Sequence, residues 1–498
     1  MAPRLQTLPQ EIQLNIAKSL QDSYQDFELD KSMYSLAMTC RRFYQITEPL
    51  LYSRYSDEKQ TITNVGRFIR TLISRPDLWQ NVKFLSVTFS DGRSMRDLDI
   101  DKYLETFADA KSLQYILNPK PYTLEGLELE RDLKVRKIAN LVGDWERFTR
   151  VVRNPIQVFE MQSGWNNGLA GRSVNNYQTL LATILTLLSP GIQKLQLKRP
   201  ISLGRAQRPT RLPRRPIFPQ IFNTREPTLL RLLSLQEVHY TTAGRLTPAV
   251  EPIWAAQAAR LDSFLRIPTL KSLKVDGFAF RSILKNWIDK PRSYALESLD
   301  LKYDFDVEFE KFKAFLSIFK GLKNFSYDGK IRDVVNPEFF RQMMEGLYAN
   351  KESMESISLT SICRFKDDHS ILEVSNNGFA NFPRLKRMKM QMDLLIGVDD
   401  ESPNFELKNI LPKSLERLEL WSQCKYESPD AEKHLLDLIR GRSAFPRLQE
   451  LKIVYSTRYP ISDSMVDNVK AICGEMGVEF VVVPMPGTKY WMAQMPLE

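Results

Sequence analysis

The sequence predicts an α/β solenoid of strand–helix repeats, preceded by a small all-α motif at the N-terminus. Three observations predict it: an apolar phrase that recurs every 26 to 33 residues, helical patterns between the phrases, and a purely helical pattern before residue 55. At 498 residues and 43% hydrophobic composition, the chain exceeds the roughly 250 to 300 residues at which a single core stops growing. We therefore expect an elongated repeat array or two units.

The repeated phrase is an apolar residue, two variable residues, and two apolar residues separated by one. Its successive instances begin 26, 26, 32, 31, 30 and 33 residues apart, at Leu270, Leu296, Leu322, Met354, Leu385, Leu415 and Leu448. Looser instances begin at Val82, Ile192 and Leu235. Apolar residues that alternate over so short a stretch predict a strand with one buried face.

Helical patterns lie between the phrases. Residues 280–288 carry one apolar stripe, and the aromatic residues of 309–319 recur at helical spacing, which predicts core packing rather than a cofactor site. Pro429, which follows a serine, and Ser462 are typical helix starts, and a glycine follows each of these two segments. A strand and a helix of this size cannot bury their own apolar faces, so stacking of the repeats must supply the core.

These repeats resemble the leucine-rich-repeat family, in which strands line a concave face and helices line the convex one. The sequence departs from that family after the strands, where an asparagine or cysteine normally satisfies the loop backbone. Other residues occupy this place in most repeats, among them Asp304, Lys330, Asp393 and Gln423. The resemblance therefore implies a leucine-rich-repeat-like solenoid with degenerate repeats.

The N-terminal segment 7–52 has a different pattern. Thr7 to Gln10 resembles a capping box that tolerates a proline in the first turn. Apolar residues at helical spacing then predict three short helices: Leu8, Ile12, Ile16 and Leu20; Leu36, Cys40 and Phe43; and Ile46, Leu50 and Leu51. A motif of about 45 residues is close to the smallest that folds alone, so it gains from a partner that covers its exposed stripe.

This segment is similar to the F-box family. The matching fragments, in order, are Leu8-Pro9-Gln10-Glu11-Ile12, Leu36, Cys40-Arg41-Arg42-Phe43 and Pro49-Leu50-Leu51-Tyr52. The departure is a long polar spacer at 21–31. The resemblance implies binding to a Skp-type adaptor, and through it to a cullin scaffold with a RING subunit. The adaptor-binding residues that it implies are Leu8, Pro9, Glu11, Ile12, Ile16, Leu36, Cys40, Arg41 and Phe43, some of which would instead hold the three helices together. The alternative is a plain N-terminal cap for the solenoid.

The resulting plan has four parts. An F-box-like helical motif covers 1–55, an irregular part of the repeat domain covers 56–190, the solenoid covers 191–483 with a basic, proline-rich insertion at 198–225, and a tail covers 484–498. The repeats would present an unknown target protein for ubiquitin transfer, which makes the chain a substrate-recognition subunit and not an enzyme. The alternative is a repeat scaffold that binds a protein or an RNA without any link to ubiquitin.

The outward residues of the C-terminal strands predict where the target binds. Side chains between the apolar positions of a strand point to the opposite face. They are Arg387, Lys389 and Gln391, then Arg417, Glu419 and Trp421, then Glu450, Lys452 and Val454. Tryptophan and arginine are enriched at binding hot spots, so Trp421 is the expected centre of this patch. The alternative is that the tail, with Tyr490 and Trp491, covers it.

Charge and composition disfavour other functions. Seven basic and no acidic residues fall between Lys198 and Arg215, and without them the net charge of +10 drops to +3, which disfavours nucleic acid as a partner. Because five prolines interrupt 198–225, we expect an exposed insertion; the alternatives are a nuclear-import signal and a site for an acidic partner.

Sites for metals, cofactors and catalysis are not expected. The four cysteines form no Cys-x-x-Cys pair, and none of the three histidines has a neighbour at metal-ligand spacing. The alternative is a hydrolase or transferase site in the irregular region before Leu188. Residues 1–10 lack the layout of a signal peptide, and no apolar run approaches the ~18 residues of a membrane span. We therefore expect a cytoplasmic or nuclear protein that has no membrane partner.

Overall fold

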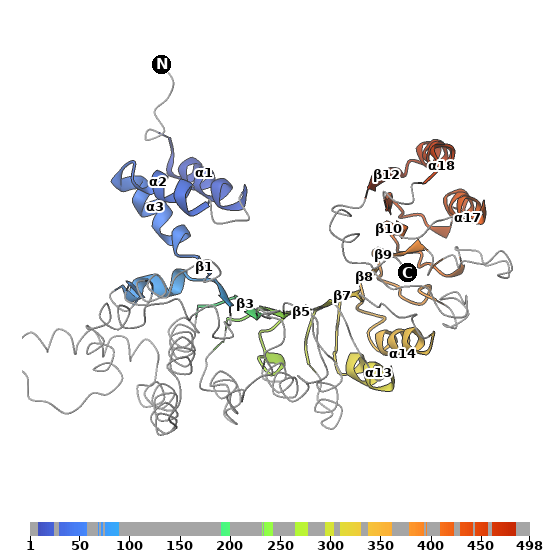
Figure 1. Cartoon of the computed structure of the whole chain (residues 1–498), viewed down its shortest axis with the longest axis horizontal. Helices are drawn as coiled ribbons and strands as arrows, with labels where there is room; N and C mark the ends of the chain where they lie inside the picture. The colour runs from blue at the N-terminus through green and yellow to red at the C-terminus, as the bar shows by residue number, and fades with distance from the viewer. Residues whose placement is uncertain are drawn as a thin grey trace, which may run out of the picture. The chain divides into compact units, whose positions relative to one another are not determined.

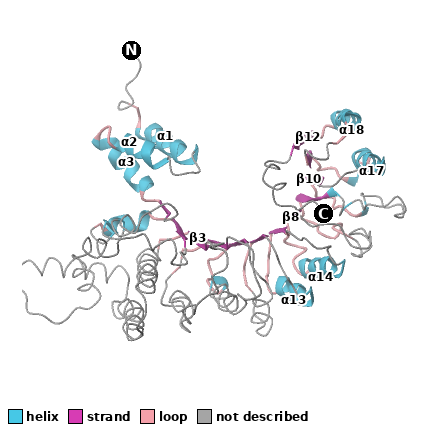
Figure 2. Cartoon of the chain, viewed as in Figure 1, coloured by secondary structure: helices cyan, strands magenta, loops and turns pink. Residues whose placement is uncertain are grey.

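The structure is a computed structural model of the whole chain (Figures 1 and 2). It describes residues 8–23, 29–56, 68, 71–72, 75–88, 191–199, 232, 234–242, 264–276, 294–302, 309–329, 337–360, 378–392, 395, 409–422, 429–441, 444–456 and 461–484. The chain divides into two compact units, and each is described by itself. The first comprises Met1–Gly244 and Arg266–Leu270, and the second comprises Arg245–Leu265 and Lys271–Glu498.

The first unit begins with three helices and continues into parallel strands. Its elements are α1 (Gln10–Ser23), α2 (Leu29–Ala37), α3 (Arg41–Leu51), β1 (Arg54–Ser56), the 3-10 helix η2 (Pro76–Asn81), β2 (Phe84–Thr88), β3 (Lys194–Arg199) and β4 (Glu237–Thr242). β1 pairs with β2, β2 with β3, and β3 with β4, all in parallel. The helical motif therefore leads directly into the first strand.

The second unit contains parallel strands, and a described helix lies between some of them in the chain. Its elements are β5 (Ser272–Asp276), β6 (Ser298–Lys302), α13 (Phe309–Ser317), β7 (Asn324–Asp328), α14 (Pro337–Tyr348), β8 (Ser356–Thr360), β9 (Arg387–Gln391), β10 (Arg417–Ser422), α17 (Pro429–Arg440), β11 (Glu450–Tyr455), α18 (Asp463–Met476) and β12 (Glu479–Pro484). From β5 to β12 each strand pairs in parallel with the next one in the chain. Parallel neighbours require a crossover, which the intervening segments provide.

Twelve parallel strands thus follow one another in chain order among the described residues, which confirms an α/β architecture consistent with a repeat solenoid (Figure 2). All ten apolar phrases coincide with strands, from β2 to β11. Within β6 the phrase residues Leu299 and Leu301 are buried and the residues between them are not. The strands β1 and β12 contain no phrase and were not predicted.

The core between strands and helices is apolar and rich in aromatic rings. The predicted packing role of segment 309–319 is confirmed for Phe312, Phe315, Leu316 and Phe319, which are all buried. The ring of Phe315 meets that of Phe319 edge to face at 5.1 Å between centroids. Helix α13 packs closely on α14 at Gly346, where an added Cβ would lie 2.8 Å from the Cβ of Leu316.

A hydrogen bond from one repeat to the next recurs just before the phrase. Ser353 donates from its hydroxyl to the carbonyl of Leu322 at 2.9 Å, and Ser414 donates to the carbonyl of Leu385 at 2.8 Å. In the first unit Thr269 donates to the carbonyl of Leu235 at 2.9 Å. Each donor directly precedes a phrase, and each acceptor is the first residue of the preceding phrase. Each hydroxyl thus satisfies a backbone carbonyl in the turn before the preceding strand.

The predicted boundaries of two helices are confirmed. Helix α17 begins at Pro429 and is followed by Gly441, and Ser462 caps α18 by accepting a bond from the backbone N–H of Met465. Gly477 ends α18 in a left-handed conformation, with φ of 66°. The predicted helix at 280–288 lies outside the described residues, as do most of 56–190 and nearly all of the insertion and the tail.

Candidate protein-binding surfaces

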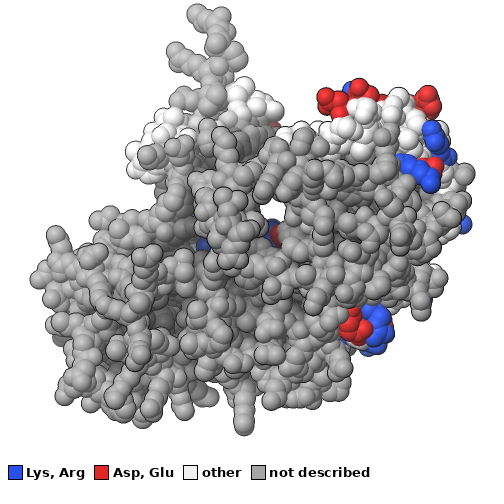
Figure 3. Space-filling view, turned by 45° about the vertical axis from the view of Figure 1, so that its right-hand side comes forward, with Lys and Arg blue, Asp and Glu red and all other residues white. Residues whose placement is uncertain are grey.

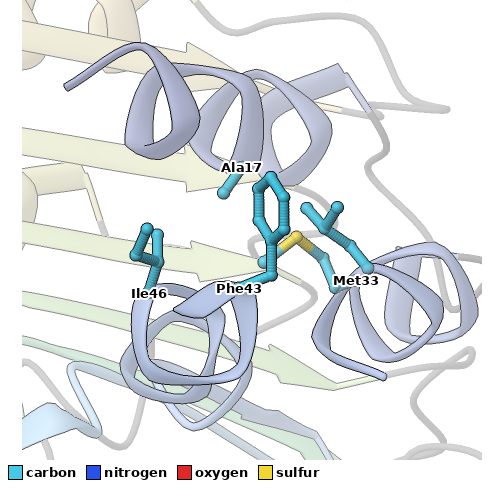
Figure 4. Close-up of a cluster of buried hydrophobic side chains, with 5 residues drawn as sticks. Ala17, Met33, Phe43 and Ile46 are labelled. Carbon is cyan, nitrogen blue, oxygen red and sulfur yellow. The ribbon is translucent and has the colours of Figure 1, made fainter. Parts of the chain in front are cut away.

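The three N-terminal helices enclose a small core of their own (Figure 4). Its buried side chains are Ala17 of α1, Met33 and Leu36 of α2, and Phe43 and Ile46 of α3. Leu14, Leu20, Cys40, Leu50 and Leu51 pack around them and are partly buried. The ring of Phe43 is 1% exposed and lies between the other two helices, so it joins all three.

The Cys40-Arg41-Arg42-Phe43 fragment is a helix start. Cys40 is the N-cap of α3, and its Sγ accepts a bond from the backbone N–H of Phe43 at 3.5 Å. Its backbone is extended, with φ of −165° and ψ of 164°, as an N-cap requires. The fragment therefore fixes the first turn of α3 and directs Phe43 into the core.

Uncovered apolar side chains gather on this motif. The large hydrophobic residues that are exposed among the described ranges are Ile12, Tyr34, Met38 and Tyr44, and all four belong to the motif. Tyr34 and Met38 are separated by one helical turn, which places them on one side of α2. On the face of the motif seen in Figure 3, the described side chains are almost all uncharged. Among the described residues, the large hydrophobic side chains that are exposed thus all lie in this motif.

The predicted adaptor residues divide between this surface and the core. Pro9, Glu11, Ile12 and Arg41 are exposed, and Leu8, Ile16 and Cys40 are partly buried. Leu36 and Phe43 are buried, so these are the two that hold the helices together, and their place in the adaptor surface is corrected. The row from Leu8 to Leu20 also changes face along α1, because each four-residue step turns the helix by about 40° more than a full turn. Ile12 faces solvent, and Leu20 packs on the core.

Tyr34, Met38 and Tyr44 were not predicted. One sequence feature could have indicated Tyr34 and Met38: they are four residues apart, and Tyr34 directly follows the buried Met33. Tyr44 donates its hydroxyl to Glu48 one turn further along α3 at 2.5 Å. That bond, more than burial, raises the pKa of Tyr44 above its ordinary value.

An ion-pair network joins this motif to the first repeat. Arg75 donates from both of its terminal nitrogens to the carboxylate of Glu48, at 3.2 and 3.3 Å. It also binds Asp77 in the first turn of η2 at 2.7 Å. After α3, the carbonyl of Ser53 accepts bonds from the backbone N–H groups of Lys83 and Phe84. The end of α3 is therefore fixed to the strand that begins the repeats.

The second candidate surface is the outward face of β9, β10 and β11. The strand register aligns its residues in rows: Arg387, Arg417 and Glu450; Lys389, Glu419 and Lys452; and Gln391, Trp421 and Val454. The first two rows are exposed or partly exposed, as predicted. In the third row the prediction of exposed side chains was wrong for Gln391 and Val454, which are buried at 5% and 2% exposure. The broad indole of Trp421 lies between them in the register.

Glu419 is the centre of a polar network on this face. Its carboxylate binds Lys389 at 3.1 Å and Lys452 at 3.2 Å, and accepts a bond from the Trp421 indole N–H at 2.5 Å. The ammonium of Lys389 also lies 4.2 Å from the centroid of the Trp421 ring. Burial raises the pKa of Glu419, but these bonds outweigh it and hold the pKa below its ordinary value. Trp421 is therefore a member of a network and not an isolated apolar anchor.

The residues suited to metal binding do not gather in the described ranges. No group of three or more His, Cys, Asp or Glu side chains there could hold a metal ion. The irregular region before Leu188, where an enzyme site was the alternative, lies largely outside those ranges. In the same ranges no helix is both long enough and apolar enough to cross a membrane.

Comparisons with known proteins add little. No family model matches the sequence, and no curated protein matches it. A crystal structure of a Bacteroides fragilis protein from the Northeast Structural Genomics Consortium is similar, with a TM-score of 0.30. The identity is 11%, over 54% of this chain and 69% of that chain. So distant a likeness carries no argument, and the fold rests on the strand pairing described above.

Proposed function

We propose that this chain is the substrate-recognition subunit of a Skp-cullin-F-box type ubiquitin ligase. In this proposal the N-terminal helices bind a Skp-type adaptor, which connects them to a cullin scaffold, and the strand face of the repeats holds a target protein. The chain acts by binding and brings its target to a ubiquitin-transfer machinery supplied by others. It would work in the cytoplasm or the nucleus.

The observation that carries the proposal is that, among the described residues, the exposed large apolar side chains all lie in the N-terminal motif. Monomeric proteins leave few such side chains together, and groups of them mark interaction sites. Ile12, Tyr34 and Met38 are 45%, 60% and 66% exposed. A motif with so small a core gains stability when a partner covers these side chains.

The rival interpretation of the motif, a plain cap for the solenoid, fits this observation less well. A cap covers the apolar end of a repeat array with its own apolar side chains, which would then be buried. Here the buried side chains of α1 and α2 pack on α3, and Ile12, Tyr34 and Met38 remain exposed. The ion pairs of Arg75 attach the motif through α3 and leave the other two helices available for a partner.

Co-purification with a Skp-type adaptor tests the proposal. We expect the full chain to capture the adaptor. The pair Tyr34→Ala and Met38→Ala should weaken capture by at least about tenfold, or about 1.4 kcal/mol, since one hot-spot side chain alone contributes about 2 kcal/mol or more. Ser35→Ala, an exposed change on the same helix, is the matched control and should bind like the unaltered chain. Helical circular dichroism should be the same for all three.

The outcomes separate the alternatives. If the unaltered chain captures no adaptor, the proposal fails, and a repeat scaffold without a ubiquitin link becomes the better account. If capture survives the loss of Tyr34 and Met38, a second pair, Pro9→Ala with Ile12→Ala, tests the exposed side of α1. Capture that is unaffected by both pairs would mean that the adaptor binds elsewhere.

A further inference from the structure

Basic residues outnumber acidic residues on the outward face of β9, β10 and β11. The four cations are Arg387, Lys389, Arg417 and Lys452, and the two anions are Glu419 and Glu450. We call the four cations the basic strand face. Arg417 and Arg387 are exposed, and the two lysine side chains are 36% and 30% exposed. The face therefore carries a local excess of two positive charges.

The pairing of these groups shows where the excess lies. Arg417 pairs with Glu450 at 3.5 Å, and the two lysines share the single carboxylate of Glu419. Arg387 donates to a neutral acceptor, the side-chain oxygen of Asn324, at 3.4 Å. On β8, the strand next to β9, the outward residues are serines and a threonine. The positive excess is therefore greatest around β9, where Arg387 and Lys389 lie.

The same sheet has a different charge balance elsewhere. The outward charged residues of β5, β6 and β7 are Lys274, Asp276, Asp300, Lys302 and Asp328. Acidic residues are in the majority there, and Lys274 pairs with Asp300 at 3.5 Å. The excess of cations is thus a property of the basic strand face and not of the whole sheet.

The basic strand face is also organised before any ligand arrives. Glu419 holds both lysines, and the ring of Trp421 lies against the ammonium of Lys389. Arg387 and Arg417 are partners in the strand register, so their backbones lie about 4.8 Å apart. Two neighbouring guanidinium groups offer forked donors that match carboxylates. Side chains that are already ordered lose less entropy on binding.

From these observations we propose that the basic strand face binds an acidic segment of a protein, with carboxylates of that segment paired to Arg387 and Arg417. This inference rests on the proposed function in one respect, because the bound segment would belong to the target. It gives that target a chemistry: a stretch rich in Asp or Glu. The contacts are charge-assisted, so binding weakens as salt rises.

Fluorescence anisotropy with a labelled peptide of six Glu-Gly repeats tests the inference on the full chain. We expect this peptide to bind, and the same peptide with Gln in place of Glu not to bind. Arg387→Glu with Arg417→Glu should weaken binding by at least about tenfold. Lys274→Glu with Lys302→Glu changes the net charge of the chain equally on the same sheet, and should alter the dissociation constant by less than about threefold.

Further variants and peptides decide the remaining outcomes. Arg387→Gln with Arg417→Gln repeats the test if the reversed charges reduce the melting temperature. Equal weakening by the control pair would overturn the inference, because the overall charge of the chain would then explain binding. A phosphoserine peptide that binds when the Glu peptide does not would also overturn it in favour of phosphate recognition. Adaptor capture by the same preparations reports on the proposed function separately.

Discussion

A buried asparagine, Asn350, gives the sharpest test of how the repeats are joined. It is 3% exposed and lies in the turn after α14. Its side-chain oxygen accepts bonds from the backbone N–H groups of Gly321 and Leu322, both at 3.1 Å. Those two groups belong to the turn before β7, one repeat earlier. One side chain therefore satisfies two backbone donors of its neighbour.

The substitution Asn350→Ala removes the acceptor and leaves both donors in place. An unsatisfied buried N–H costs about 1–3 kcal/mol. The residue Leu322 is fully buried, so its N–H would bear that cost, whereas the N–H of Gly321 lies in a partly buried bond that water can replace. We therefore expect the free energy of unfolding to fall by about 1–3 kcal/mol, a sizeable part of the 5–15 kcal/mol typical of a domain.

Urea unfolding and hydrogen exchange measure this effect. Exchange at the amide of Leu322 should accelerate in Asn350→Ala, which reports on the turn itself even if the two units unfold separately. Asn324→Ala is the matched control. This asparagine lies on the strand face, where its side-chain oxygen accepts a long bond of 3.4 Å from Arg387. It should cost less than about 0.5 kcal/mol. Unchanged stability and unchanged protection of Leu322 in Asn350→Ala would refute the reasoning.

Three further predictions concern single positions. Cys40→Ala should speed amide exchange in the first turn of α3 and cost about 1 kcal/mol, whereas Cys40→Ser should keep the cap. Gly346→Ala should lower the free energy of unfolding by about 1–3 kcal/mol through contact with Leu316, while Gly474→Ala, where an added Cβ meets nothing within 4 Å, should raise it by up to about 1 kcal/mol. Burial raises the pKa of Cys473 to about 11, so iodoacetamide at pH 8 should alkylate it slowly until urea unfolds the chain.

The strands were predictable because burial imposes a period of two on their sequence. In β6 the phrase residues Leu299 and Leu301 are buried and their neighbours are not. In every phrase but one the residue between the last two apolar residues is likewise not buried; the exception is β2, where Ser86 is buried. β12 was missed because Phe480 to Val483 is an unbroken apolar run, which does not distinguish a strand from a buried helix. β1 has three residues, too few for any period to show.

The bonds that join the repeats were not predictable in the same way. The pattern of the leucine-rich-repeat family places an asparagine or cysteine after the strand, and most of the repeats in this sequence lack it. The structure has Asn350 and Ser353 before the next phrase instead, bonded to the previous turn. Which side chain reaches which carbonyl depends on the path of two loops, and a local pattern does not encode that path.

The helical motif shows a similar limit. Apolar spacing predicted three helices, and three are present, but the predicted second group was wrong: Leu36 belongs to α2, Cys40 is the N-cap of α3 and Phe43 lies in α3. The spacing also placed Leu36 and Phe43 on the same surface as Ile12. A motif of this size needs some of its apolar residues for its own core, and the residues nearest the centre of the motif are the ones buried there. Phe43 lies three residues after the N-cap Cys40, and its side chain is buried in the core. The exposed Tyr34 lies next to the buried Met33 in α2, and the exposed Met38 directly follows that helix.

The strand faces show how one scaffold can carry different binding chemistry. Each strand must keep its inward residues apolar, because burial of residues such as Leu418 and Leu420 stabilises the stack. The outward residues carry no such demand, and along the same sheet their charge changes from an acidic majority on β5 to β7 to a basic majority on β9 to β11. If the basic strand face binds an acidic segment as proposed, a substitution at Arg387 or Arg417 would alter the environment of that segment while the core stays intact. Selectivity for the partner would then reside in side chains that the fold itself does not need.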